Sequence, residues 1–311
     1  NEKAATRYGS THKWAVLVGD ISNMYDEIPP ELASNCTTGA LDLASDWIGR
    51  RRVQHFNYNF MGTDPQWGRA NTDKRGEMDF EQLRSLIEYD CANTLFNFQG
   101  KIYRRTMGVP MGGFMSPQMA QTTCGTGEMR LAPPDQLIGG TRRYMDDVLS
   151  VWAYTTDAEW RLIQRWFSVL IRAYPPPLVL NIEDESDSHQ YLDMYVTTDG
   201  PHLSCRVVNP VLQRLHSDAH LWLPRLPPVG DGTTNTERAS LMVGTLHRIA
   251  DGSSTSQGLQ TSIDELGQET VASGWSIRRL TTAIAAAALH MERYGMFGWV
   301  FPLISQLLPR G

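Results

Sequence analysis

The 311-residue sequence has few cysteines and no long apolar run. Its four cysteines (Cys36, Cys91, Cys124 and Cys205) lie far apart and form no C-x-x-C pair, which argues against a zinc site or a disulfide framework. The chain shows no signal-peptide pattern at its start. No uninterrupted run reaches the roughly 20 apolar residues that a spanning helix needs, so we expect no membrane association.

An excess of positive charge is also absent. The chain carries 28 basic and 34 acidic residues, a net charge of −6, which excludes a basic tail or an overall cationic coat for nucleic acid. A local basic groove stays compatible with this balance, because net charge says nothing about distribution. Of the basic residues, 24 are Arg and 4 are Lys. Arginine suits bidentate phosphate contacts, although a GC-rich coding sequence produces the same bias.

Length and hydrophobic content indicate a globular chain of two lobes. Hydrophobic residues make up 41% of the sequence, enough for a real core. Apolar periodicity predicts strands at residues 14–21, 53–60, 179–182 and 191–196, and strand hairpins at 96–104 and 144–152. It predicts helices at 31–52, 80–93, 118–129, 157–173, 237–250, 262–273 and 276–291. This order predicts an α+β lobe followed by an α-helical lobe.

Smaller features complete the predicted order of elements. The hairpin at 96–104 is expected to turn at Gln99-Gly100, and Asp157 is expected to cap the helix that follows it. Residues 62–76 are polar and contain Gly and Pro, so they are predicted to form a loop. The glycine-rich stretch 107–117 is predicted to be irregular.

Three carboxylates are notable for their positions. Asp20 ends an apolar strand, and Asp146 and Asp147 are adjacent at the tip of a predicted hairpin. Neighbouring carboxylates repel and raise each other's pKa, so a pair at a strand tip is typical of a cation site with hard oxygen ligands. The alternative from the dipeptide alone is a polar hairpin turn.

Four motifs then occur in a familiar order. Tyr144–Asp147 resembles the Y-x-D-D signature of reverse transcriptases, and Asp20 with Tyr25 five residues later resembles the preceding motif of that family. The stretch 108–117 resembles its G-x-x-M-G-x-x-x-S-P motif, and 191–193 resembles its F-L-D primer-grip element. The continuation after Tyr25 and the motif order are similar to Penelope-like retroelements and telomerase-type reverse transcriptases.

The resemblance implies an α+β fold, with a reverse-transcriptase-like palm of antiparallel sheet and helices and then an α-helical thumb. Residues 1–205 would be the palm with part of the fingers, and residues 206–311 the thumb. The implied activity is that of an RNA-directed DNA polymerase, a nucleotidyltransferase that adds deoxynucleotides to a primer 3′-hydroxyl. The implied cofactor is two Mg²⁺ ions, with Mn²⁺ as a substitute. The implied partners are an RNA template, a DNA primer and deoxynucleoside triphosphates, in the nucleus or an organelle.

The resemblance also assigns site residues. The metal-binding and catalytic set would be Asp20, the carbonyl of Ile21, Asp146 and Asp147. The nucleotide-binding set would be Tyr25, whose ring would exclude a ribose 2′-hydroxyl, with Met111, Gly112 and Gly113. The primer- and template-binding set would be Gly108, Arg142, Arg143, Tyr144, Met145, Tyr191, Leu192 and Asp193.

Two readings compete with an active reverse transcriptase. Relatives carry fingers ahead of the first catalytic acid, and only 19 residues precede Asp20 here. We therefore expect that a second chain supplies the fingers, or that the chain is an inactive, domesticated subunit that scaffolds a ribonucleoprotein. An RNA-directed RNA polymerase shares the palm, but Tyr25 and the primer-grip resemblance disfavour it.

Overall fold

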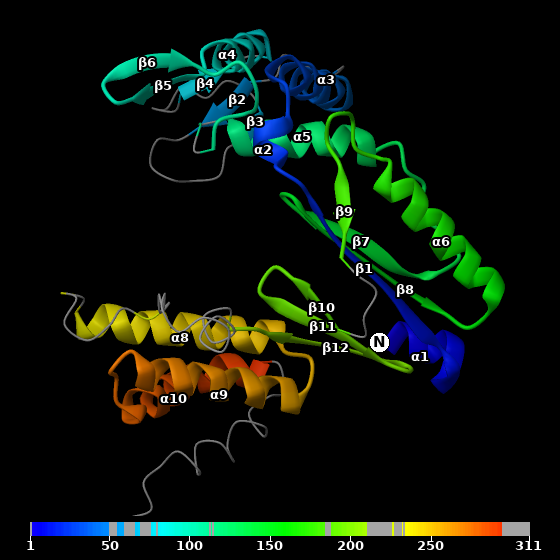
Figure 1. Ribbon diagram of the computed structural model, residues 1–311, viewed down its shortest axis with the longest axis vertical. Coiled ribbons are helices and arrows are strands. Elements are labelled where there is room, and N and C mark those ends of the chain that lie inside the picture. The colour runs from blue at the N-terminus through cyan, green and yellow to red at the C-terminus, as the bar shows by residue number, and fades with distance from the viewer. Residues whose placement is uncertain are drawn as a thin grey trace, which may run out of the picture. The chain divides into compact units, whose positions relative to one another are not determined.

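The computed structural model describes residues 2–49, 55–58, 66–68, 76–78, 80–111, 113, 115–183, 188–209, 226, 232 and 234–293 (Figure 1). The chain divides into two compact units. The first unit comprises Asn1–Val18, Val151–Thr155 and Asp184–Gly311, and the second comprises Gly19–Ser150 and Thr156–Glu183. The expected palm–thumb boundary at residue 205 falls within a strand, and that functional division stays a prediction.

A four-stranded sheet carries the predicted catalytic motifs. Its strand order is β7-β8-β1-β9, with bounds Ile138–Tyr144, Asp147–Tyr154, Lys13–Ile21 and Leu180–Ile182. Strand β1 lies between two neighbours and is apolar over most of its length, as expected for an interior strand. Its end pairs antiparallel with β9, with Asp20 opposite Asn181. The strand predicted at 14–21 is therefore confirmed.

Five helices belong to the second unit. They are α2 (Met24–Glu27), α3 (Pro30–Gly49), α4 (Phe80–Ala92), α5 (Ser116–Glu128) and α6 (Asp157–Ile171). Helices α3 and α5 meet at Thr37 and Thr122, whose hydroxyl oxygens are 2.7 Å apart. Helix α6 runs along the β7–β8 hairpin, and its Trp166 donates to the hydroxyl of Ser150 at 3.1 Å (Figure 1). The first contact joins two helices to each other, and the second joins α6 to the sheet that carries the acids.

Two smaller sheets also belong to the second unit. Strand β2 (His55–Tyr58) lies between β3 (Gln66–Gly68) and β4 (Gly76–Met78). Strands β5 (Leu95–Phe98) and β6 (Lys101–Arg104) form a separate hairpin. Its turn residues Gln99 and Gly100 have φ values of 52° and 77°, the pattern of a two-residue hairpin turn, so the predicted turn is confirmed.

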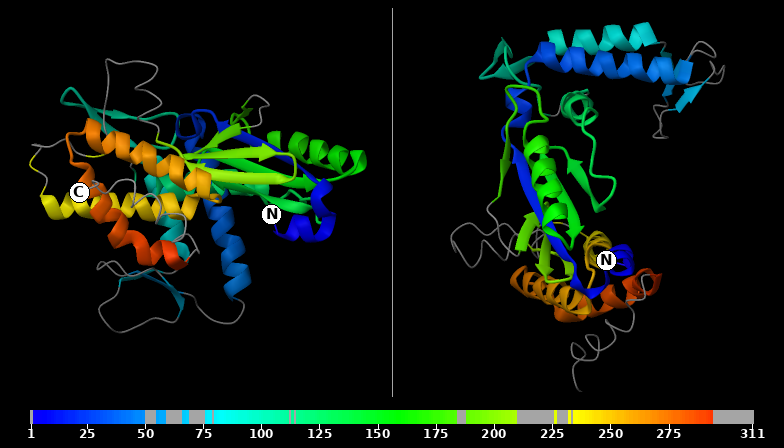
Figure 2. Two further views of the ribbon diagram at one scale, coloured as in Figure 1. Left: turned by 90° about the horizontal axis from the view of Figure 1, so that it is seen from below. Right: turned by 90° about the vertical axis from the view of Figure 1, so that its right-hand side faces the viewer.

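The first unit combines a three-stranded sheet with helices. The sheet order is β10-β11-β12, with bounds Ser188–Tyr191, Met194–Asp199 and His202–Val207. The helices are α1 (Glu2–Tyr8), α8 (Asn235–Gly252), α9 (Ser256–Ala272) and α10 (Ile277–Arg293). The last three lie side by side (Figure 2) and bury a shared apolar core that includes Leu246, Leu259 and Ile284. None of the helices in the described part of the chain has the length and apolar content to cross a bilayer.

Several predicted details are wrong. The stretch 62–76 contains strand β3 instead of being a loop throughout. The strand predicted at 191–196 is interrupted by a hairpin turn at Leu192, which has a φ of 56°. Thr156, not Asp157, caps α6, because its hydroxyl accepts from Glu159 N while the Glu159 carboxylate accepts from Thr156 N. Helix α1 and strand β12 were not predicted.

Candidate active site

The predicted acids meet at the end of the β7–β8 hairpin. Met145 and Asp146 form the two-residue turn, and Asp147 begins β8. The backbone N–H of Ile21 donates to the carbonyl of Asp146 at 2.9 Å. This main-chain bond sets Asp20 beside the Asp146-Asp147 pair, so the structure brings the three acids together. Their catalytic role stays a prediction.

Electrostatics at this tip follow from burial and like charge. Partial burial raises the pKa of Asp20, and the Asp146 carboxylate raises it further. Burial also raises the pKa of Asp147, followed by repulsion from Asp146, Asp20 and Glu183. The ionised carboxylates therefore destabilise one another when no cation is present.

Glu183 is a neighbouring acid that sequence reasoning missed. It follows directly after β9, two residues beyond Asn181, which pairs with Asp20. Alternate residues of a strand share a face. The two-residue spacing of Asn181 and Glu183 was the sequence signal that could have placed Glu183 near Asp20.

The donor chemistry fits small divalent cations. Carboxylate oxygens and a backbone carbonyl such as that of Ile21 are the hard ligands that Mg²⁺ prefers. In the described ranges, no three His, Cys, Asp or Glu side chains are arranged to share one metal ion. The acids are thus close enough to repel, but their side chains do not converge on one point.

Arg143 was expected to bind nucleic acid, and the structure corrects this. Its side chain is only 6% exposed and makes five hydrogen bonds: two to the carboxylate of Glu128, two to Gln121 and one of 2.8 Å to the carbonyl of Met145. These use all five N–H donors of a guanidinium, so none is left for phosphate. Arg143 instead fastens the hairpin turn to helix α5.

Glu128 and Gln121 are site residues that the sequence assignment did not include. They lie seven residues apart, two turns along one face of α5. Tyr174 also donates to Glu128 Oε1 at 3.0 Å, and burial followed by the Glu128 charge raises the pKa of Tyr174. Burial alone would lower the pKa of Arg143, but the hydrogen bond and charge of Glu128 more than offset this. The result is a charge-paired polar cluster behind the turn.

Tyr25 lies next to the turn. Its hydroxyl is 3.6 Å from Met145 Sδ, and the Gln121 amide nitrogen is 3.3 Å from the same sulfur. Burial raises the pKa of Tyr25, with a smaller contribution from the charge of Asp146. Met145, which lies between Tyr144 and Asp146 in the Y-x-D-D motif, therefore contacts Tyr25 of the preceding motif.

The glycine loop packs on its own chain. Gly108 has a φ of 78°, and a Cβ there would lie 2.7 Å from the carbonyl oxygen of Tyr25. A Cβ at Gly113 would collide with the hydroxyl of Ser116. We predicted that these glycines admit template and nucleotide, but the close neighbours that require glycine belong to the protein itself. Gly112 lies outside the described residues.

Other predicted contact residues differ in exposure. Met111 and Tyr144 are 71% and 59% exposed, and Arg142 is also exposed, so all three can meet a ligand. Tyr191, Leu192 and Asp193 belong to the first unit, where they form the β10–β11 turn. Tyr191 is buried, Leu192 is exposed, and Asp193 Oδ2 is 2.7 Å from Arg248 Nε. Their primer-binding role stays a prediction.

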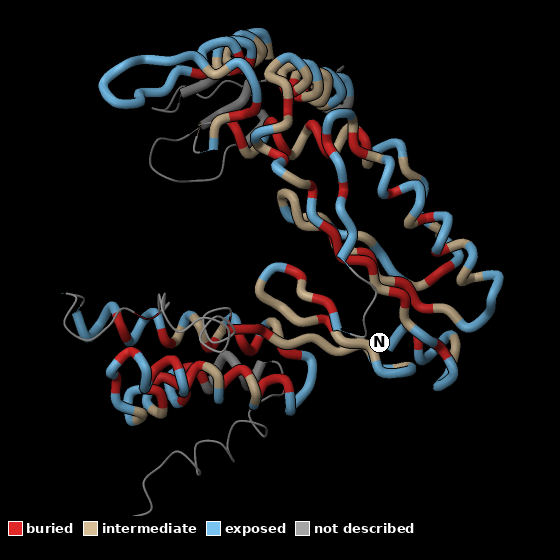
Figure 3. Tube along the Cα trace, viewed as in Figure 1, coloured by how far each residue is buried: buried red, intermediate tan, exposed pale blue. Residues whose placement is uncertain are grey.

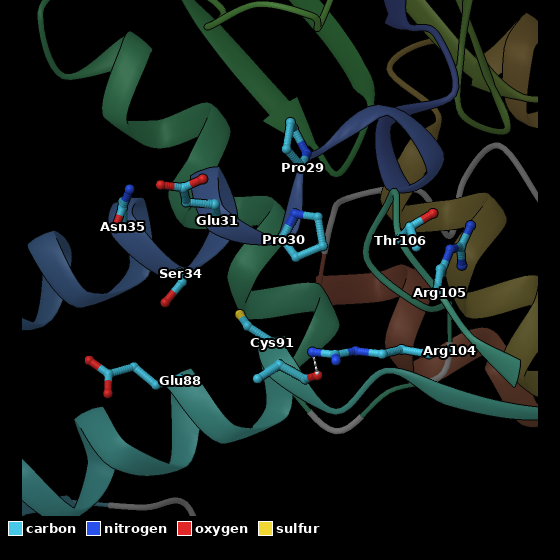
Figure 4. A pocket seen from close by; sticks show the side chains of 11 residues that line it. Pro29, Pro30, Glu31, Ser34, Asn35, Glu88, Cys91, Arg104, Arg105 and Thr106 are labelled. Atoms are coloured by element: carbon cyan, nitrogen blue, oxygen red, sulfur yellow. Dashed lines mark hydrogen bonds between the residues drawn. The ribbon is translucent and has the colours of Figure 1, made fainter.

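A separate cavity of about 620 Å³ lies between the start of α3 and the end of α4 (Figure 4). Glu31 and Glu88 line it together with Arg104 and Arg105, and none of the predicted site residues does. Arg104 donates to the carbonyl of Ala92 at 2.6 Å, and Arg105 pairs with Asp26. These two guanidinium groups connect the end of β6 to the rest of the unit.

Comparison with known proteins yields a likeness in structure alone. No family model and no curated protein matches the sequence. The chain is similar to the telomerase of Candida albicans solved in complex with a TWJ fragment of telomeric RNA, with a TM-score of 0.58, 10% identity, and coverage of 98% of this chain and 50% of that one. It is also similar to apo telomerase from Candida tropicalis, with a TM-score of 0.50, 9% identity, and coverage of 93% and 47%.

The chain thus spans about half the length of the telomerase structures that it matches. At this level of identity the likeness concerns the fold, and fold does not fix function. The arrangement of helices around antiparallel sheets agrees with the fold class predicted from the sequence. The chain has a reverse-transcriptase-like fold.

Proposed function

We propose that this chain is an RNA-directed DNA polymerase that adds deoxynucleotides to the 3′-hydroxyl of a DNA primer on an RNA template. The observation that carries the proposal is the 2.9 Å bond from Ile21 N to the Asp146 carbonyl, which sets Asp20 beside Asp146 and Asp147. Phosphoryl transfer depends chiefly on positioning and charge neutralisation, and a strand end next to a hairpin tip is a rigid place for both.

Asp20, Asp146, Asp147 and the Ile21 carbonyl would hold two Mg²⁺ or Mn²⁺ ions. When bound, such ions activate the attacking hydroxyl and neutralise charge on the departing pyrophosphate. Burial, and then repulsion from neighbouring carboxylates, raises the pKa of Asp20 and of Asp147, and this supports the assignment because a bound cation would offset both effects. The chain's own part is to hold these oxygens at the tip through β1 and the Arg143 cluster.

Tyr25 would select deoxynucleotides. Its ring lies near Asp146 and is fixed at its hydroxyl end by Met145, so a sugar bound at the tip would meet the ring. A ribose 2′-hydroxyl there would clash with the ring, whereas a deoxyribose would fit. This role distinguishes the proposed activity from that of an RNA-directed RNA polymerase.

The motif order and the likeness to telomerase folds support placement in the Penelope-like and telomerase branch. A nuclear or organellar site of action is part of the same proposal. The similar Candida albicans structure contains a TWJ fragment of telomeric RNA, which agrees with RNA as a partner.

A second candidate is an inactive subunit that scaffolds a ribonucleoprotein. The observation that favours it is that no three potential ligand side chains converge on a metal position in the part of the chain that the structure describes. A scaffold would use the same fold without needing the acids.

Primer extension separates the two candidates. The full chain is incubated with an RNA template, a labelled DNA primer, deoxynucleotides and Mg²⁺ or Mn²⁺. We expect extension that is lost in Asp146→Asn and retained in Asp135→Asn, which removes an exposed acid elsewhere in the second unit. RNA binding without extension under either metal would favour the scaffold, and extension with ribonucleotides alone would favour an RNA polymerase.

A further inference from the structure

The β5–β6 hairpin exposes large apolar side chains. Phe96, Phe98 and Tyr103 are 50%, 58% and 44% exposed, and the hairpin is pale blue throughout in Figure 3. Exposed aromatic groups that lie together on a short hairpin are unusual on a solvated surface, and such patches mark interaction sites. None of these residues belongs to the candidate active site.

The register of the hairpin sorts its side chains onto two faces. Phe96 lies opposite Tyr103, and Phe98 lies opposite Lys101. Alternate residues share a face, so the three rings and the lysine lie on one side of the hairpin. The rings of Phe96 and Tyr103 stack with their centroids 5.7 Å apart and their planes at 24°. We call this set of four residues the aromatic face.

The hairpin is ordered by hydrogen bonds of its own turn and by hydrogen bonds at its base. Gly100 N donates to Asn97 Oδ1 at 3.0 Å in the turn. At the base, Arg105 N donates to the carbonyl of Thr94 at 2.8 Å, and Arg104 bonds to Ala92 as described above. A ligand that binds here therefore loses little affinity to ordering of the protein.

The hairpin itself, residues 95–104, carries basic side chains and no acidic one. The chain has 34 acidic residues, yet residues 91–127 contain no Asp or Glu. The same stretch contains Lys101, Arg104 and Arg105. Arg104 and Arg105 are bonded within the unit, which leaves Lys101 on the aromatic face as the cation directed at a ligand.

We propose that the aromatic face of Phe96, Phe98, Lys101 and Tyr103 binds single-stranded nucleic acid by stacking unpaired bases on its rings. Unpaired bases present flat apolar faces between phosphates, which match rings placed beside a cation. A duplex buries those faces and would bind only through Lys101. Identification of the bound strand as the unpaired template rests on the proposed function. The binding of single strands does not.

The test measures binding, not catalysis. Fluorescence anisotropy with labelled oligo(U) and oligo(dT) is compared with a fully paired RNA duplex. We expect Phe98→Ala and Tyr103→Ala each to weaken single-strand binding about tenfold. Lys101→Ala should reduce the salt dependence by about one released ion. Two controls should bind as the wild type does: Ile102→Ala, on the opposite face and 74% exposed, and Tyr89→Ala, an exposed aromatic on α4.

A second measurement covers the case in which an alanine variant fails to fold. Wild-type chain is photocrosslinked to oligo(U) that contains 5-iodouridine, and the adduct is mapped by mass spectrometry. Adducts on Phe96, Phe98 or Tyr103 support the proposal. Adducts confined to other segments, or equal loss of affinity in Ile102→Ala, would overturn it, as would alanine variants that change only self-association. Asp146→Asn should keep the adducts, so failure of polymerisation and failure of this inference are distinguishable.

Discussion

The guanidinium of Arg143 forms two hydrogen bonds with the carboxylate of Glu128, Nε to Oε1 at 2.5 Å and Nη2 to Oε2 at 3.2 Å. Arg143 also donates to the carbonyl of Met145 at 2.8 Å. One side chain therefore connects α5, strand β7 and the turn that carries Asp146. The direction of the turn that carries Asp146 depends on this connection.

Loss of the Arg143 side chain should be costly. Arg143→Met leaves the carboxylate of Glu128 without its cation. Because Glu128 is partly exposed, we expect a cost below the roughly 3–5 kcal/mol of a fully buried ion pair. Arg142→Met, at the exposed neighbouring position, should change the free energy of unfolding by less than about 0.5 kcal/mol. Urea denaturation measures both. Equal, small effects would show that the cluster does not stabilise the fold.

Gly108 should not tolerate a side chain. Gly108→Ala adds a Cβ 2.7 Å from the Tyr25 carbonyl oxygen and holds alanine at a φ of 78°, a conformation that alone costs about 1–2 kcal/mol. The matched control is Gly125→Ala in α5, where a Cβ meets nothing within 4 Å. That substitution should stabilise the chain by about 0.5–1 kcal/mol, because alanine is the better helix former. The opposite ranking in urea denaturation would contradict the packing of the loop on α2.

The stability of the metal-free chain should fall as the acids ionise. The raised pKa of Asp147 means that the folded state holds this proton more tightly than the unfolded state does. Stability is therefore lost as pH rises from about 3.8 through the raised pKa, and Asp147→Asn should lack this loss. Thermal unfolding across this pH range measures it, with Asp135→Asn as the control. A variant with the wild-type pH dependence would contradict the burial and like-charge repulsion that raise the pKa of Asp147.

Added Mg²⁺ should reverse the effect. At about 100 times its dissociation constant, a ligand that binds only the folded state adds about 2.7 kcal/mol. We expect this gain in the wild type and its loss in Asp20→Asn and Asp146→Asn. Thermal unfolding with and without the ion, at constant ionic strength, is the measurement. A gain that survives both substitutions would place the cation elsewhere.

Tyr25 should set sugar selectivity through its ring. Tyr25→Val removes the ring, and we expect ribonucleotide incorporation relative to deoxynucleotide incorporation to rise by at least about tenfold, which corresponds to about 1.4 kcal/mol. Tyr25→Phe keeps the ring and loses only the contact to Met145 Sδ, so its selectivity should stay close to that of the wild type. Single-nucleotide primer extension supplies the ratios. Loss of selectivity in both variants would assign the effect to the hydroxyl.

Much of the fold was predictable because its signals are local. The apolar run of β1, the turn residues Gln99 and Gly100 and the amphipathic pattern of α6 each specify an element without reference to the rest of the chain. The cap of α6 was also within reach, because Thr156 and Glu159 have the spacing of a capping box. We instead predicted the adjacent Asp157 as the cap.

The closeness of Asp20 to Asp146 and Asp147 was predictable, but the direction of the neighbouring side chains was not. Arg142 and Arg143 are neighbours on a strand, so they point to opposite faces, and the sequence does not say which face meets α5. The glycines of the loop show the same gap. The sequence shows that glycines are present at these positions. It does not show which group lies against them, because that group, the backbone of Tyr25 in the case of Gly108, is brought there by tertiary packing.

The bond that aligns the two parts of the proposed active centre runs from main chain to main chain, from Ile21 to Asp146. No carboxylate takes part in it, so the framework does not depend on the chemistry it supports. Substitution of the acids would leave this bond and the architecture intact. A chain that shares this fold therefore need not share the reaction.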